Sequence, residues 1–174
     1  STNPPADTKE RPDNPYAKQP DDKRFQYIFS TYRLTEHHTA GGMSRTLGHL
    51  SELQPELFCE VSPELAREAG LQHGEWATIT SPRGIVTARV LVTPRMTPLT
   101  VAGRRVHTIG MPYHWGWKGV AQGDVANDIL AISEEPNVRI METKALVCNI
   151  VPGRRRPDDA GALEQWRAQL RRSA

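Results

Sequence analysis

Short alternations of hydrophobic and polar residues recur through the middle of this chain, with turn-forming residues between them. Residues 25–31, FQYIFST, alternate with the period of two that is typical of a β-strand. Similar patterns predict further strands at 57–61, 75–81, 84–92 and 143–151, and a strand pair within 100–109. Because the turns are frequent and the periods non-helical, these six or so strands favour a β-barrel or sandwich over an α/β sheet.

One short helix is predicted between these strands, at residues 63–69. Ser62 is a favourable N-cap, Pro63 fits the first helical position, and Gly70 fits the helix end. Residues 81–84, SPRG, are typical of a turn, so the strands on either side of them are expected to form a hairpin.

The two ends of the chain differ from its middle. Residues 1–24 hold five prolines among charges and amides, which is typical of an extended arm without a core of its own. Residues 153–174 begin with a basic run and then place leucine and tryptophan at helical spacing, which predicts a tail with a short docked helix. We therefore expect one folded domain at 25–152.

Composition narrows the classes of function. The chain has 22 basic and 20 acidic side chains, which argues against general nucleic-acid binding because such binding needs a strong basic surplus. No apolar run approaches the roughly 20 residues of a membrane span, and no signal peptide is recognisable. Cys59 and Cys148 lie in strand-like sequence without metal-site spacing, so we expect both to be core residues.

Residues 110–128, GMPYHWGWKGVAQGDVAND, concentrate aromatic residues and glycines in one stretch. Trp115 and Trp117 offer flat faces and ring N–H donors. His114 and Asn127 both donate and accept hydrogen bonds, which suits a heteroaromatic ligand, and the glycines let the backbone approach it closely. The alternative interpretation is an aromatic minicore beneath a surface loop.

A second concentration of polar chemistry, TYRLTEHHTAGGMSR at 31–45, follows the first predicted strand. Arg33 carries a planar donor fork that suits phosphate, and His37 and His38 add ring nitrogens. Hydroxyl groups come from Thr31, Thr35, Thr39 and Ser44. A polar loop at a strand end commonly presents ligand contacts on a rigid frame, and a solvated loop with two incidental histidines is the alternative.

Taken together, four stretches resemble a known family. They are STYRLTEHHTAGGMSR at 30–45, the block beginning VSPELAREAG at 61–93, MPYHWGWKGVAQGDVANDI at 111–129 and ETKALVCNI at 142–150. They resemble the C-terminal domain of molybdenum- or tungsten-dependent oxidoreductases of the dimethyl-sulfoxide-reductase superfamily, and in particular the catalytic subunit of formate dehydrogenases. That domain binds molybdopterin guanine dinucleotide.

The resemblance implies a mainly β fold with small helices, namely a double-psi β-barrel, in which the two polar loops converge on the dinucleotide. Carried over by position, the implied cofactor contacts are Thr31, Arg33, Thr35, His37, His38, Thr39, His114, Trp115, Asn127, Thr143 and Lys144. At position 143 many relatives have a tyrosine.

The resemblance also implies a contribution to formate oxidation to CO2 within a larger enzyme. The iron–sulfur cysteines, the cysteine or selenocysteine metal ligand and the His–Arg pair near formate cannot be placed in this chain, so we expect no catalysis by it alone and no metal ligand in it. The expected partners are the remainder of the catalytic subunit and an iron–sulfur electron-transfer subunit. A periplasmic or membrane-associated respiratory complex is favoured over a cytoplasmic one.

Two alternatives remain open at this point. One is a barrel module for assembly or interaction without a cofactor, in which the arm and the tail are the working parts. The other is the small barrel subunit of formylmethanofuran dehydrogenase, although the HWGW and ETKAL stretches look more like the formate enzymes.

Overall fold

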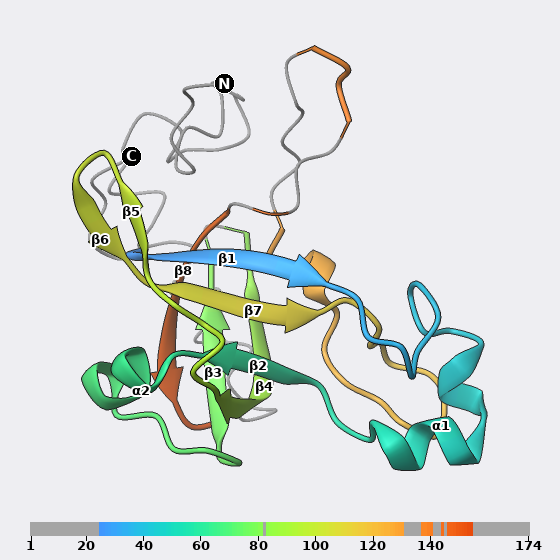
Figure 1. Cartoon of the computed structure of the whole chain (residues 1–174). Coiled ribbons are helices and arrows are strands. Elements are labelled where there is room, and N and C mark those ends of the chain that lie inside the picture. Colours follow the sequence, from blue (N-terminus) through green and yellow to red (C-terminus); the bar gives the residue numbers. More distant parts are fainter. Residues whose placement is uncertain (1–24, 82, 131–136, 141–143, 145, 155–174) are drawn as a thin grey trace.

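The computed structural model describes residues 25–81, 83–130, 137–140, 144 and 146–154 (Figure 1). The arm expected at 1–24 and the helix expected within 153–174 lie outside these residues.

Six strands close into a barrel in the order β1-β7-β2-β4-β3-β8. Their bounds are β1 Tyr27–Tyr32, β2 Phe58–Val61, β3 Trp76–Thr80, β4 Ile85–Val92, β7 Thr108–Pro112 and β8 Leu146–Pro152. The pairs β1–β7 and β2–β4 are parallel, and the other four pairs around the barrel are antiparallel. The expectation of a mainly β barrel with small helices is confirmed.

The predicted alternation supplies the core, because every second strand residue faces the barrel interior. Strands β3 and β4 bury Ala77, Ile79, Val86, Ala88 and Val90 in this way. Cys59 and Cys148 are fully buried free thiols in the same core, as expected. Burial raises the pKa of the Cys59 thiol to about 12, so it stays protonated and unreactive at neutral pH.

The predicted helix is present as α2, Pro63–Ala69. The Ser62 hydroxyl accepts a hydrogen bond from the Leu65 N–H at 3.0 Å, and Gly70 ends the helix in the left-handed conformation. A second helix, α1 at Gly48–Leu53, and two short 3₁₀ helices, η1 at Ser44–Thr46 and η2 at Ala126–Asp128, were not predicted. Among the described residues, no helix has the length and apolar character needed to cross a bilayer.

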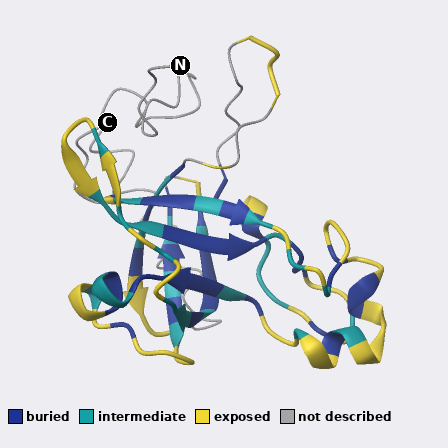
Figure 2. Cartoon of the chain, viewed as in Figure 1, coloured by how far each residue is buried: buried dark blue, intermediate teal, exposed yellow. Residues whose placement is uncertain are grey.

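A two-stranded hairpin stands away from the barrel (Figures 1 and 2). It consists of β5, Leu99–Val101, and β6, Arg104–Val106. The turn residues Ala102 and Gly103 both have positive φ, which matches the twist that a two-residue hairpin turn needs. The strand pair expected within 100–109 is therefore this hairpin, while β7 follows it and joins the barrel.

Candidate functional site

The two loops that the sequence singled out leave the same end of the barrel. Strands β1 and β7 are parallel neighbours, with Tyr32 opposite Pro112 in the register. The Tyr113 N–H continues the pairing by donating to the Tyr32 carbonyl at 3.1 Å. The connection from β1 to β2 and the loop after β7 therefore start side by side, and α1 lies beyond them (Figure 1).

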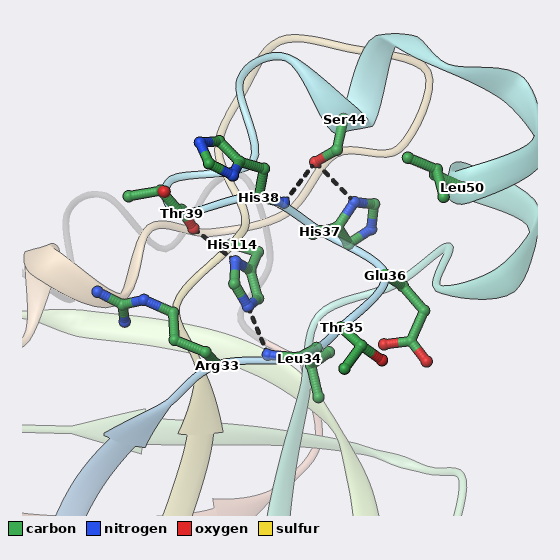
Figure 3. A pocket seen from close by; sticks show the side chains of 10 residues that line it. All are labelled: Arg33, Leu34, Thr35, Glu36, His37, His38, Thr39, Ser44, Leu50 and His114. Carbon is green, nitrogen blue, oxygen red and sulfur yellow. Dashed lines mark hydrogen bonds between the residues drawn. The ribbon is translucent and has the colours of Figure 1, made fainter.

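A pocket of about 480 Å³ opens where these loops meet (Figure 3). Its lining residues are Arg33, Leu34, Thr35, Glu36, His37, His38, Thr39, Ser44, Leu50 and His114. Six of the residues expected to contact a cofactor thus share one pocket, including Arg33 from one loop and His114 from the other.

His114 is fully buried and joins the two loops through both ring nitrogens. Its Nε2 accepts from the Leu34 N–H at 2.6 Å, and its Nδ1–H donates to the Thr39 carbonyl at 2.5 Å (Figure 3). This pair of partners requires the neutral ring. Burial lowers the pKa of His114; the Thr39 carbonyl opposes this effect, and the Arg33 charge adds to it.

Stability is expected to fall with acidification because of His114. The unfolded chain takes up the proton first, so the stabilisation from neutral His114 is complete above the ordinary pKa of about 6.5 and is lost as the pH falls toward the lowered value. Thermal unfolding of the 174-residue chain at about pH 7.5 and about pH 5.5 measures this loss. In His114→Gln the pH dependence should be smaller; an unchanged dependence would show that other groups cause it.

His37 is also buried, and both of its ring nitrogens are occupied. Its Nε2–H donates to the Gln54 carbonyl at 2.9 Å, and its Nδ1 accepts from the Ser44 hydroxyl at 3.1 Å. The same Ser44 oxygen accepts from the His38 N–H at 3.0 Å. His37 therefore braces the pocket wall, whereas the side chains of His38 and Thr39 are exposed at the pocket.

Trp115 belongs to the core rather than to the pocket lining. Its ring meets the ring of His37 edge-on at 5.1 Å between centroids and the ring of Phe58 edge-on at 6.4 Å. The buried Nε1–H of Trp115 has no hydrogen-bond partner among the described residues. The aromatic minicore interpretation thus holds for Trp115, while Trp117 is exposed.

Thr31, Asn127 and Lys144 are not among the residues that line the pocket. The guanidinium of Arg33 stacks over the ring of Tyr113 at 4.4 Å, and the Tyr113 hydroxyl donates to Oδ1 of Asn127. Lys144 is exposed and donates from Nζ to the carbonyl of Thr31, whose side chain is buried. Thr143 lies outside the described residues.

Arg45 is the residue of this site that the sequence interpretation missed. Its buried guanidinium donates to four carbonyls of the opposite loop: those of His114 at 2.9 Å, Gly116 at 3.1 Å, Ala121 at 3.3 Å, and Lys118. Its own carbonyl accepts from the Val120 N–H at 2.7 Å. Burial lowers the pKa of Arg45, but arginine keeps its charge. Arg45 therefore holds the loop after β7 in place.

The glycines of the two loops also serve this contact. A Cβ on Gly41 would lie 1.9 Å from the His114 carbonyl oxygen, and one on Gly119 would lie 2.8 Å from that of Arg45. Both glycines have positive φ, which other residues rarely adopt. The missing side chains at Gly41 and Gly119 therefore let one loop approach the other.

Glu36, His37, His38 and His114 line the pocket, but among the described residues no three metal-binding side chains there are close enough to share an ion. Among the described residues, one group of three is close enough to share an ion: Glu64, Glu68 and His107, beside α2. Arg105 already pairs with Glu64 there, at 2.5 Å.

Known proteins resemble this chain in sequence and in fold. The family model described as the molydopterin dinucleotide binding domain matches residues 27–146. The chain is 40% identical over 129 residues to formate dehydrogenase 2 subunit alpha (cytochrome c-553) of Nitratidesulfovibrio vulgaris. The matched region covers 74% of this chain and 13% of that relative. It is also 40% identical over 129 residues to the nitrate-inducible formate dehydrogenase major subunit of Escherichia coli, and this match covers 74% of this chain and 12% of that relative. The chain thus spans about an eighth of the length of these curated relatives.

Among solved structures, acetylene hydratase from Pelobacter acetylenicus is similar in fold, with a TM-score of 0.61 and 15% identity. The match covers 83% of this chain and 21% of that one. At this identity the likeness concerns the fold alone.

Proposed function

Because this chain belongs to the family described as the molydopterin dinucleotide binding domain, we propose that it binds molybdopterin guanine dinucleotide as the C-terminal part of a molybdenum or tungsten formate dehydrogenase. In this proposal the barrel domain spans 25–152, between an arm at 1–24 and a tail at 153–174. The parallel pairs β1–β7 and β2–β4 support the double-psi type of barrel.

The observation that carries the proposal is the shared pocket of Arg33 and His114 between the two loops. Its donor set fits a pterin dinucleotide. Arg33 is exposed at the rim, where a permanent charge and a fork of N–H donors suit pyrophosphate oxygens. Thr35, His38 and Thr39 line the pocket with exposed polar side chains, which suit the donors and acceptors of a pterin edge.

The pocket residues divide into two roles in this proposal. Arg33, Thr35, His38 and Thr39 contact the dinucleotide directly, and Asn127 and Lys144 add further polar groups. His37 and His114 act as positioning residues, because backbone and side-chain partners already occupy their ring nitrogens.

The redox chemistry would come from the molybdenum or tungsten carried by the cofactor, while this chain binds and orients the cofactor and excludes water from it. Formate oxidation to CO2 would then take place in the remainder of the catalytic subunit, which passes electrons to an iron–sulfur subunit. The small share of the relatives that this chain covers supports such a division.

Replacing Arg33 tests the assignment. Arg33→Ala should weaken cofactor binding roughly 10- to 150-fold, because a hydrogen bond to a charged group contributes about 1.5–3 kcal/mol. The measurement is the metal and pterin content of the assembled enzyme after dialysis. Arg67→Ala, at an exposed position on α2, is the matched control and should retain full content. Full metal and pterin occupancy in Arg33→Ala would count against the proposal.

A further inference from the structure

Five large hydrophobic side chains are exposed on two segments beside the pocket, which Arg45 joins by hydrogen bonds. They are Met43 at 69%, Leu47 at 47%, Leu53 at 65%, Trp117 at 73% and Val120 at 70%. We call the segment that carries them, residues 43–53 with 116–123, the apolar lobe. It contains η1 and α1 and lies at the opposite end of the barrel from α2 (Figures 1 and 2).

The lobe is internally bonded, so these side chains are held out from an ordered surface. The Arg45 guanidinium donates to the carbonyls of Gly116, Lys118 and Ala121, which joins the two segments of the lobe. The Arg45 carbonyl accepts from the Val120 N–H at 2.7 Å and from the Ser51 hydroxyl at 3.1 Å. An ordered surface that exposes several large apolar side chains is typical of an interface.

The same lobe forms part of the pocket wall. Ser44 and Leu50 line the pocket, and all the other lining residues come from 33–39 and His114. The walls of the pocket in this chain are therefore formed by the β1–β2 connection and by His114. A surface docked on the lobe would stand next to the pocket and could supply its other wall.

We propose that the apolar lobe is the docking surface for the remaining part of the larger molybdoenzyme catalytic polypeptide. This inference rests on the proposed function, because that function requires such a part. The occupant follows from size: relatives that match at 40% identity have about seven-eighths of their length outside the matched region. A remaining part of that size is large enough to cover both the lobe and the adjacent pocket.

The exposed chemistry describes the surface that would meet the lobe. Trp117 is the most exposed of the five side chains and is the natural anchor, because buried tryptophans contribute strongly to interfaces. Lys118 lies over the Trp117 ring, with Nζ at 4.7 Å from its centroid. The opposing surface is therefore apolar, with a recess for an indole ring and an acceptor or carboxylate for Lys118.

Oxidative footprinting tests this docking. The free 174-residue chain and the enzyme purified with this sequence are exposed to hydroxyl radicals, and labelling is read by mass spectrometry. In the enzyme, Trp117 and Met43 should label about tenfold more slowly than in the free chain, because interface cores exclude water. Leu99 and Val151, both 47% exposed and outside the lobe, are the controls and should label equally in both samples.

Three outcomes would overturn the proposal. If Trp117 labels at the same rate in the free chain and in an enzyme that contains the pterin dinucleotide, the lobe is not a docking surface, and the proposed function is unaffected. Slow labelling in a free chain that sediments as a dimer would assign the lobe to a second copy. An enzyme without the dinucleotide would remove the proposed function on which the inference rests.

A paired substitution adds a readout that folding alone does not affect. The double variant Trp117→Ser/Val120→Ser should leave unfolding of the free chain unchanged while lowering the melting temperature of the enzyme by about 2–4 °C. The double variant Leu99→Ser/Val151→Ser is the matched control and should change neither. Equal melting temperatures for the wild-type and lobe-variant enzymes would contradict the docking.

Discussion

Gly41→Ala should destabilise the chain by about 3 kcal/mol, through left-handed backbone strain and a steric clash together. The φ of Gly41 is +76°, and a Cβ there would lie 1.9 Å from the His114 carbonyl oxygen and 3.0 Å from Nε of Arg45. Neither neighbour can move freely, because the His114 carbonyl already accepts from Arg45. Relief of the clash would therefore separate the two loops that form the pocket.

The next residue provides the control for this substitution. Gly42 has no heavy atom within 4 Å of its would-be Cβ, and its φ lies outside the positive range. Gly42→Ala should therefore change stability by less than about 0.5 kcal/mol. Urea unfolding of both variants, each as the 174-residue chain, measures the difference. Coincident unfolding midpoints for Gly41→Ala and Gly42→Ala would show that the loop contact contributes nothing to stability.

Arg45→Met should cost about 3 kcal/mol, because it leaves several buried carbonyls without the charged donor that they share. Methionine is also unbranched, but it is shorter and has no donor, so the substitution removes the hydrogen bonds and leaves the position of the guanidinium unfilled. Hydrogen exchange should show where the loss falls. The amide of Val120, which donates to the Arg45 carbonyl, should exchange faster, whereas amides of the barrel strands should keep their protection.

A lysine at the same position separates charge from geometry. Arg45→Lys keeps the positive charge but cannot reach carbonyls of residues 114, 116, 118 and 121 with one ammonium group, so we expect about half of the destabilisation to remain. If Arg45→Met unfolds at the same urea concentration as the wild-type chain, these bonds do not hold the loop.

The barrel strands and α2 could be predicted because their signals are local. Alternation in β3 and β4 predicted which residues enter the core, and Ser62, Pro63 and Gly70 marked the ends of α2. Helix α1 lacked such signals: no side chain caps it, and Ser51 is its only buried residue. Its position depends on contacts with the rest of the lobe, which a sequence pattern does not contain.

The convergence of the two loops was predictable, but the hydrogen bonds between them were not. The resemblance placed Arg33 and His114 on converging loops, and they do line one pocket. The bonds of His114 to Leu34 and Thr39, and those of Arg45 across the site, join residues about seventy to eighty positions apart. Such long-range partners decide whether a polar side chain faces a ligand or braces the fold, and no local spacing reveals them.

The two cysteines of this chain have a practical consequence. Both thiols are sealed inside the barrel, and burial raises the pKa of each, so neither offers a thiolate to solvent while the fold is intact. A maleimide dye or spin probe attached to a new surface thiol, for example at the hairpin tip near residue 103, would therefore report from that point alone. Distance spectroscopy on this domain needs no prior removal of its native sulfur groups.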